Sequence, residues 1–256
     1  MSLTEIRAAS GTYTVEYHKT LGSTNTYLKE LARAGAPNGT VVVAEAQSAG
    51  RGRYGRSFFS PEGAGIYMSV LFRASLSPEA VSRITPFAAV CVCEAIESVC
   101  KIKAGIKWVN DIIINGKKVC GILAEAERSQ KDGAPEFVVL GIGLNAKRSA
   151  FPEELSGIAC ALEELCDTAP DKDELISEML ERLSPLLCGT VPHDSLEKYR
   201  ERSIFIGKSV YTLSEPSVSG IAEDIDENGA LLVRKKDGTL QKISAGEVSI
   251  RERKSL

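Results

Sequence analysis

Histidine is scarce in this sequence of 256 residues: only His18 and His193 occur, and neither lies beside a glycine-rich segment. A catalytic Ser–His or Cys–His pair therefore has little support. The seven cysteines include no Cys-x-x-Cys pair, and most have apolar neighbours. A zinc site is not expected, and reduced thiols in a cytoplasmic protein are the better interpretation.

Long apolar runs and a strong charge of one sign are also lacking. The longest apolar run, residues 87–93, is shorter than the ~20 residues that span a bilayer, and no signal-peptide pattern begins the chain. Lys and Arg number 31 against 34 Asp and Glu, a net charge of −3 that argues against a nucleic-acid coat protein or a basic membrane-surface protein. With 43% hydrophobic residues, the composition is that of a globular protein with one or two domains.

Hydrophobic periodicity predicts a body of mixed strands and helices. Helices are expected over residues 24–34, 78–100, 171–187 and 193–202, with Ser23 or Thr24 as a cap and a bend or break at Pro86. The pair Asn115-Gly116 predicts a tight hairpin. Strands are expected over residues 12–17, 41–46, 66–72, 106–109, 111–114, 119–126 and 137–141.

The pattern changes after about residue 204, where short strands are separated by turns. They cover residues 210–213, 220–225, 230–234 and 240–244, and such evenly spaced short strands are typical of a small β-barrel. We therefore expect an α+β fold: a mixed β-sheet body with flanking helices over residues 1–203, followed by a small all-β module over residues 204–256.

The segment from Gly50 to Arg56 is the most informative motif, because three arginines alternate there with three glycines. Glycine allows close backbone approach, and arginine supplies planar, permanently charged donors for carboxylate and phosphate. The segment is neither a phosphate loop nor a dinucleotide fingerprint. We interpret it as a flexible anion clamp; the alternatives are a mobile surface loop or a patch that touches nucleic acid.

Four other motifs carry chemistry, and each has a structural alternative. In Lys107-Trp108-Val109-Asn110-Asp111, the tryptophan could be core and the last two residues a turn. In the strand after Lys118, Gly121 would let a ligand lie against the backbone, or it could be a packing glycine. Gly141-Ile142-Gly143-Leu144-Asn145 is weak alone, and Ser23-Thr24-Asn25 is explained equally well as a helix cap.

Taken together and in this order, the motifs resemble those of the biotin–protein ligases. The resemblance is strong over residues 23–145, and the terminal module resembles, more weakly, the SH3-like domain of bacterial members. It implies a class II synthetase-like core that joins biotin to ATP, with Mg²⁺, as biotinyl-5′-AMP. Biotin then passes to one lysine on the biotin-carrier domain of a carboxylase of the acetyl-CoA carboxylase type. The reaction needs converging cations rather than a protein nucleophile.

The resemblance also implies roles for individual residues. Lys118, Arg51, Lys107 and Asp111 would be catalytic, and no metal ligand is assigned. Two residues depart from the family pattern: Val109 stands where proline is usual, and Phe58 where some members have tryptophan. Phe58, Gly141, Gly143 and Asn145 would bind the nucleotide, and the biotin or adenylate site would comprise Ser23, Thr24, Asn25, Gln47, Arg51, Gly52, Arg53, Lys118 and Gly121.

Three alternative functions stay open at this point. A lipoate–protein ligase of the same fold would share the chemistry, a nucleic-acid-binding module could use the arginines, and a non-enzymatic biotin sensor would bind without transfer. Only 22 residues precede Ser23, which leaves no room for the winged helix-turn-helix of repressor-type members, so operator binding is not expected. We expect no nucleic-acid or membrane partner, and a homodimer is plausible because strand-edge dimers occur in the family.

Overall fold

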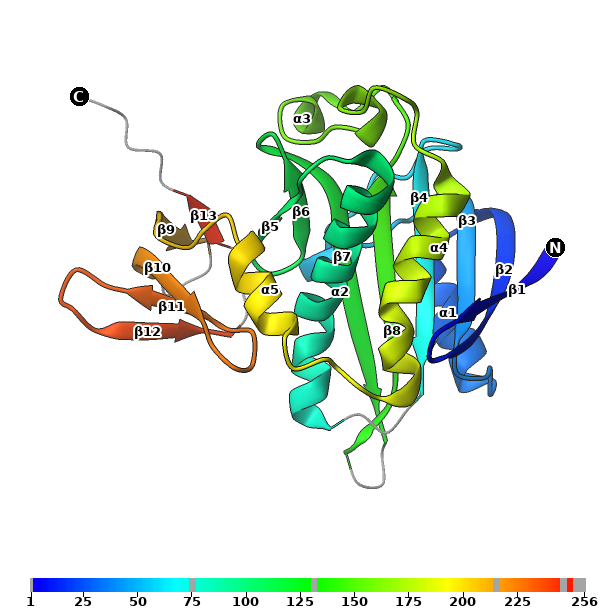
Figure 1. The fold of residues 1–256 in the computed structure, drawn as a ribbon, viewed down its shortest axis with the longest axis horizontal. Helices are drawn as coiled ribbons and strands as arrows, with labels where there is room; N and C mark the ends of the chain where they lie inside the picture. Colours follow the sequence, from blue (N-terminus) through cyan, green and yellow to red (C-terminus); the bar gives the residue numbers. More distant parts are fainter. Residues whose placement is uncertain (1, 74–76, 130–132, 214–216, 245–247, 251–256) are drawn as a thin grey trace.

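The computed structural model describes residues 2–73, 77–129, 133–213, 217–244 and 248–250. Its main feature is an eight-stranded sheet in the order β1-β2-β3-β4-β8-β7-β6-β5 (Figure 1). The β2–β3 pair is parallel and the other pairs are antiparallel, so the sheet is mixed, as predicted. The strands are β1 Ser2–Ala8, β2 Gly11–Leu21, β3 Thr40–Gln47, β4 Gly65–Phe72, β5 Gly105–Lys107, β6 Asp111–Ile114, β7 Lys117–Arg128 and β8 Pro135–Asn145.

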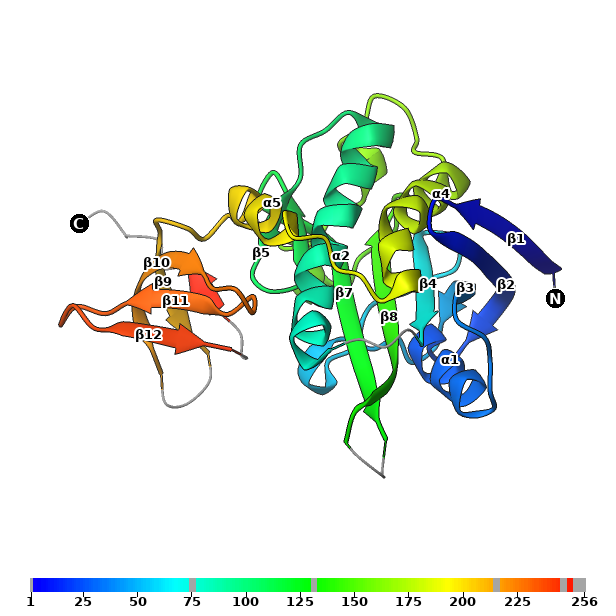
Figure 2. The same ribbon diagram turned by 60° about the horizontal axis from the view of Figure 1, so that its bottom comes forward.

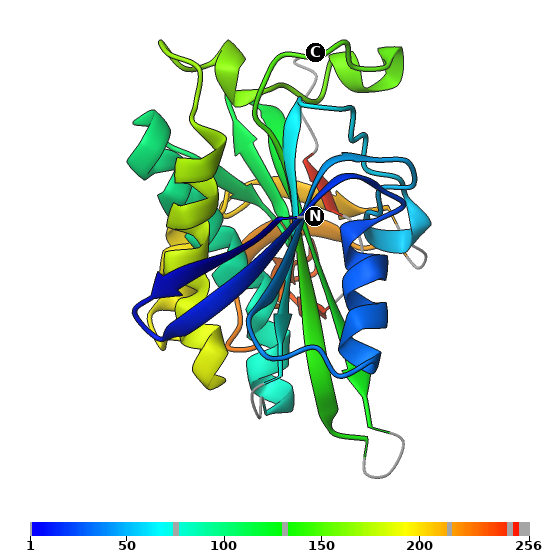
Figure 3. The same ribbon diagram turned by 90° about the vertical axis from the view of Figure 1, so that its right-hand side faces the viewer.

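Helices cover both faces of this sheet. Helix α1, Thr24–Arg33, lies on one face, while α2, Pro78–Cys100, and α4, Lys172–Leu183, lie on the other (Figure 3). The central strand β4 is buried along its whole length, and its side chains contribute to the hydrophobic cores on both faces of the sheet. Its side chains at Ile66, Met68, Val70 and Phe72 join the larger core under α2 and α4, whereas Leu71 joins the smaller core under α1. The neighbouring side chains of Val70, Leu71 and Phe72 therefore lie on opposite faces of the sheet in turn.

The C-terminal residues form a separate five-stranded antiparallel sheet beside the main body (Figure 2). Helix α5, Ser195–Arg202, precedes it and contacts it: the Arg200 guanidinium Nε donates to the carbonyl oxygen of Ile225 at 2.7 Å. The strand order is β12-β11-β10-β9-β13. The strands are β9 Ser209–Thr212, β10 Ser219–Ile225, β11 Leu231–Arg234, β12 Leu240–Ile243 and β13 Val248–Ile250.

Several expected boundaries need correction. We expected a bend or a break at Pro86; helix α2 continues through this residue, so it is not broken there. A Cβ on Gly229 would lie 2.9 Å from the Pro86 ring, so the proline packs against a turn of the C-terminal sheet. The helix expected over residues 171–187 ends as α4 at Leu183 and continues as a 3-10 turn through Pro185, and the last helix begins at Ser195 rather than 193.

Some short elements were not predicted: β1, β13, the helix α3 Glu153–Ser156, and 3-10 turns at Arg53–Gly55 and Leu162–Glu164. The hairpin at Asn115-Gly116 is confirmed, because both residues have positive φ, 50° and 78°, as a tight turn between β6 and β7 requires.

Candidate active site

Six separated chain segments enclose a pocket at one end of α1. Its cavity is about 120 Å³, smaller than the 300–1,000 Å³ usual for small-molecule sites. The walls come from the start of α1, the end of β3 with the loop after it, strand β4, strand β6 with the residue before it, and strands β7 and β8. The lining comprises Ser23, Thr24, Asn25, Gln47, Arg51, Gly52, Arg53, Arg56, Ser57, Phe58, Met68, Asn110, Asp111, Lys118, Gly121, Ile122, Leu123, Gly141, Ile142 and Gly143.

The amino end of α1 is capped from another strand. Ser23 occupies the N-cap position, but its side chain makes no capping hydrogen bond. The backbone N–H of Thr24 donates instead to Gln47 Oε1 at 2.9 Å, and the Thr24 hydroxyl donates to the same oxygen at 3.2 Å. Gln47 Nε2 in turn donates to Ser60 Oγ at 2.9 Å. Ser23 is therefore the N-cap residue, as expected, but the oxygen that accepts the capping hydrogen bond comes from Gln47, which joins the helix start to the pocket wall.

Asn25 is buried and held by hydrogen bonds on both ends of its amide. Its Oδ1 accepts from Ser69 Oγ at 2.6 Å, and its Nδ2 donates to the carbonyl oxygen of Leu123 at 3.2 Å and to Glu125 Oε2 at 3.0 Å. Gly141 makes room for this arrangement, since a Cβ there would lie 2.1 Å from Asn25 Oδ1. The position of Asn25 thus depends on the absence of a side chain on β8.

The arginine-rich segment forms a small hairpin over the pocket. The backbone N–H of Phe58 donates to the carbonyl oxygen of Gly50 at 2.9 Å, and that of Gly52 donates to Arg56 at 2.7 Å. Arg53 reaches across the pocket, where its Nη1 donates to Asn110 Oδ1 at 3.3 Å. The Arg53 guanidinium therefore faces Asn110, next to strand β6, whereas the Arg51 side chain is 43% exposed.

Lys118 projects into the pocket beside a β-bulge. Its Nζ lies 2.7 Å from Asp111 Oδ1 and 5.9 Å from the centre of the Phe58 ring. The register between β6 and β7 shifts between Ile112 and Ile113, which leaves Val119 as the extra residue of a bulge next to Lys118. Bulges of this kind change the direction of neighbouring side chains. The ammonium group is thereby fixed against a carboxylate and an aromatic face.

The glycines Gly121 and Gly143 are cross-strand partners and leave a flat patch of backbone on β7 and β8. The Phe58 ring fills this space: a Cβ on Gly143 would lie 2.6 Å from Phe58 Cε1, and one on Gly121 would lie 3.3 Å from Phe58 Cε2. In this structure the room at Gly121, which we expected a ligand to use, is occupied by an aromatic side chain from the loop.

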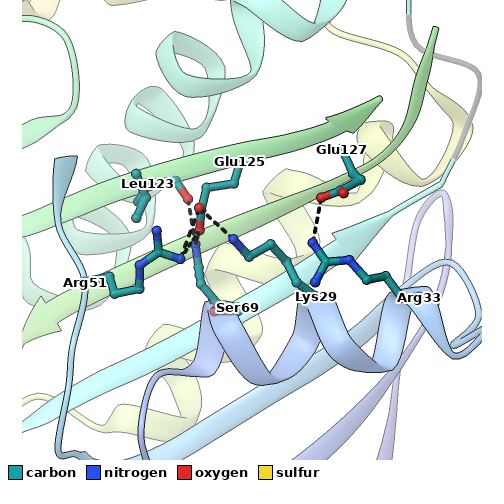
Figure 4. A network of polar contacts seen from close by, with 8 residues as sticks. Lys29, Arg33, Arg51, Ser69, Leu123, Glu125 and Glu127 are labelled. Carbon is teal, nitrogen blue, oxygen red and sulfur yellow. Dashed lines mark hydrogen bonds and ion pairs between the residues drawn. The ribbon is translucent and has the colours of Figure 1, made fainter. Parts of the chain in front are cut away.

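Glu125 connects this site to α1 (Figure 4). Its carboxylate lies 2.8 Å from Lys29 Nζ and 3.1 Å from Arg51 Nη1, and it accepts the hydrogen bond from Asn25. Burial alone would raise the pKa of the Glu125 carboxyl. The hydrogen bonds from Lys29 and Asn25, with the charges of Lys29 and Arg51, outweigh burial and hold that pKa below its usual range.

Comparisons with known proteins agree with this arrangement. Residues 17–145 match the Biotin/lipoate A/B protein ligase family, and residues 205–251 match the Biotin protein ligase C terminal domain. The chain is 35% identical over 253 residues to the Biotin--[acetyl-CoA-carboxylase] ligase of Mycobacterium tuberculosis, covering 95% of this chain and 91% of that protein. The chain belongs to the biotin protein ligase family.

Other relatives extend the likeness of this biotin protein ligase. It is 34% identical over 239 residues to the Bifunctional ligase/repressor BirA of Bacillus subtilis, covering 91% of this chain and 73% of that protein. The biotin protein ligase of Aquifex aeolicus in complex with biotin and ATP is 29% identical with a TM-score of 0.79, covering 93% and 98% of the two chains. These relatives are biotin ligases, which sets the lipoate alternative aside.

Two of the predicted site residues of this ligase lie outside the pocket lining. Lys107 is on β5, where it pairs in register with Asp111, and Asn145 ends β8, where its Nδ2 donates to the carbonyl oxygen of Cys160 at 3.3 Å. Trp108 is core: it is 4% exposed, and its indole Nε1 donates to the carbonyl oxygen of Gly229 at 3.0 Å. The remaining predicted residues line one pocket.

Sequence reasoning missed part of the lining. Asn110 lay inside a motif of the sequence analysis, but its hydrogen bonds were not predicted. Its Oδ1 accepts from Arg53 Nη1, and its Nδ2 donates to the carbonyl oxygen of Ile122 at 2.9 Å. The apolar members had no signal that separates them from ordinary strand core. The lining residues without an individual role in the sequence analysis are Arg56, which lay in the arginine-rich motif, and Ser57, Met68, Asn110, Ile122, Leu123 and Ile142.

All seven cysteines of the ligase are free, in agreement with reduced thiols. Burial raises the pKa of the Cys93 thiol to about 12 and that of Cys91 well above its usual value, so both are protonated at neutral pH. Within the described residues there is no group of three or more His, Cys, Asp or Glu side chains that could hold a metal ion. The described helices include none long and apolar enough to cross a membrane.

Proposed function

We propose that this pocket condenses biotin with ATP to biotinyl-5′-AMP and passes biotin to one lysine of a carrier domain. The observation that carries the proposal is the gathering of Arg51, Arg53 and Lys118 around a polar recess at the start of α1. In the first step a carboxylate oxygen of biotin attacks the α-phosphate and pyrophosphate leaves. In the second, the ε-amine of the acceptor lysine attacks the mixed anhydride and AMP leaves.

Electrostatics explain why cations must converge at that point. Two like charges 4 Å apart repel by about 4 kcal/mol at an effective dielectric of 20, and a carboxylate approaching a triphosphate creates several such pairs. We assign Lys118 to the reacting carboxylate and α-phosphate, and Arg51 and Arg53 to the charge of the adenylate. Gly52 lets the loop backbone approach the same ligand.

The recess lined by Ser23, Thr24, Asn25 and Gln47 would take the biotin ring system, because hydroxyl and amide groups match the donors and acceptor of its ureido group. These side chains are already held by hydrogen bonds: Thr24 to Gln47, Gln47 to Ser60 and Asn25 to Glu125. The recess is therefore preorganised. Because the cavity is only about 120 Å³, we propose that the loop and Phe58 move when both substrates bind.

We propose that the adenosine end lies near Phe58, Gly121, Gly141 and Gly143, with Asn145 beyond the pocket lining. Magnesium is held in such sites by one or two carboxylates together with substrate phosphates. Asp111, the carboxylate in the lining, would hold it, and the ion would neutralise phosphate charge. Lys107 lies outside the lining, on β5, and pairs in register with Asp111 on β6, so we propose that it acts through Asp111.

The test is to incubate the chain with biotin, ATP, Mg²⁺ and a biotin-carrier domain and to measure the intact mass of the carrier. A gain of one biotin on one lysine supports the proposal, and lipoate in place of biotin is the matched control. A carrier that stays unmodified while a known ligase labels it would refute the proposed activity.

Three further expectations remain proposals. The division at residues 203 and 204 is supported by family matches to residues 17–145 and 205–251. A cytoplasmic location is supported by the seven free cysteines. A homodimer would be detected by light scattering on the purified chain, and mobility-shift measurements would test the expectation that no nucleic acid binds.

A further inference from the structure

Glu125 is a carboxylate on which three parts of the molecule converge. Arg51 comes from the arginine loop, Lys29 from the middle of α1, and Asn25 from the first turn of α1. Glu125 itself belongs to β7 and is absent from the pocket lining, with a side chain 20% exposed. It therefore sits behind the proposed ligand-binding groups and contacts two of them directly.

We propose that Glu125 is a positioning residue that holds the Arg51 side chain, and with it the loop, in the orientation that retains the adenylate. The inference rests on the proposed function for the role of Arg51. Arg51 meets Glu125 through Nη1, whereas Nε and Nη2 form the fork that suits two oxygens of one anion. A guanidinium held by Nη1 can present that fork to the ligand.

The charges around Glu125 support the same role. Lys29 and Arg51 approach the same atom, Oε1, at 2.8 and 3.1 Å, so the two cations cannot be further apart than the sum of these distances. With Glu125 charged, its carboxylate contacts both cations and offsets their mutual repulsion. Without that charge, Lys29 and Arg51 would repel each other, and the loop arginine is the one free to move away, because its side chain is 43% exposed against 17% for Lys29.

The chain contains a matched control two residues further along β7. Glu127 pairs with Arg33 of the same helix at 3.0 Å, and this pair also joins α1 to β7 without touching the loop (Figure 4). Glu127→Gln therefore removes a helix–strand ion pair of similar geometry. Lys29→Gln is the second control, since it removes the Lys29–Glu125 ion pair and leaves the Asn25 and Arg51 contacts of Glu125 in place.

The experiment compares Glu125→Gln, Glu125→Asp, Glu127→Gln and Lys29→Gln in the full-length chain. For the parent and each variant, KM for ATP, kcat, and the rate of adenylate release after rapid removal of free ligands are measured. Glu125→Gln should raise KM and the release rate about fivefold and leave kcat at saturating substrate within about twofold. Glu127→Gln and Lys29→Gln should have the KM and release rate of the parent. Glu125→Asp should have values between those of the parent and those of Glu125→Gln.

A second readout needs no activity: trypsin cleavage at the arginines of residues 51–56 in the absence of ligands. The Glu125→Gln loop should be cut about fivefold faster than that of the parent or of Glu127→Gln. The inference is overturned if Glu125→Gln behaves as the parent in both readouts, or if either control reproduces its effects, which would indicate a purely structural role. A parent that forms no adenylate, with the cleavage difference intact, would refute the proposed function and leave the positioning of Arg51 standing.

Discussion

Replacing Gly141 by alanine probes the most crowded contact in the pocket wall. The new Cβ would lie 2.1 Å from Asn25 Oδ1, far inside van der Waals contact, so the asparagine must move. Asn25 is buried and cannot swing into solvent. Its displacement breaks the hydrogen bonds with Ser69, Leu123 and Glu125.

The expected cost follows from these hydrogen bonds. The two neutral ones contribute about 1 kcal/mol each and the one to the Glu125 carboxylate about 1.5–3 kcal/mol. Alanine regains about 0.5–1 kcal/mol by restricting the unfolded chain. The net loss is about 3 kcal/mol, which lowers Tm by roughly 6–12 °C in a protein of this size.

The assay is a pair of thermal and urea melts on Gly141→Ala and Gly121→Ala, with biotin affinity measured by calorimetry. Gly121 is the control, because its Cβ would meet the flexible end of Lys118, with Nζ at 3.1 Å, and the edge of Phe58. Its stability should stay within about 1 kcal/mol of the parent. A Gly141→Ala protein that melts within about 2 °C of the parent, or that loses no more than Gly121→Ala, would refute the reasoning.

Other substitutions test the remaining assignments. Lys118→Gln should slow biotin-dependent exchange of pyrophosphate into ATP about 10²–10³-fold; exchange at the parent rate would remove Lys118 from the reaction. Arg53→Gly should release the adenylate and label lysines of an unrelated protein, read on a streptavidin blot, and continued selectivity would contradict this role. Burial alone would raise the pKa of Asp226, but hydrogen bonds, chiefly from Lys242 and the Ala230 N–H, lower it. Its stabilising effect is therefore present above its unfolded pKa of about 4 and lost as pH falls through the lower folded value. Asp226→Asn should cost about 2 kcal/mol in urea melts at pH 7 and progressively less towards pH 2, and an equal cost at both pH values would argue against the linkage.

Local chemistry predicted most elements of the fold. Residues 66–72 form an apolar strand whose side chains enter the cores on both faces of the sheet. Asn115-Gly116 supplies the positive φ of a hairpin. The misses have nonlocal causes. Strand β1 has a largely polar sequence and gains its structure by pairing with β2. Pro86 lies against the turn at Gly229, a contact between segments far apart in the chain.

The candidate site divides in the same way. The residue types that recognise anions and amides stand in short motifs, so most of the lining could be predicted from them. The partners of those residues could not, because Glu125 and Ser69 carry no local mark of their hydrogen bonds to Asn25. Phe58 over the Gly121–Gly143 pair is a contact between segments far apart in the chain.

By itself, the sequence determined which chemical groups this ligase possesses and the order of most strands and helices along the chain. Both depend on side-chain type and short-range periodicity. Only the tertiary structure decided which of those groups meet: that Gln47 caps α1, that Lys118 faces Asp111, and that Arg51 is held by Glu125. Such pairings depend on strand register and on how α1 packs on the sheet. Both are set by burial across the whole chain, and no short segment encodes them.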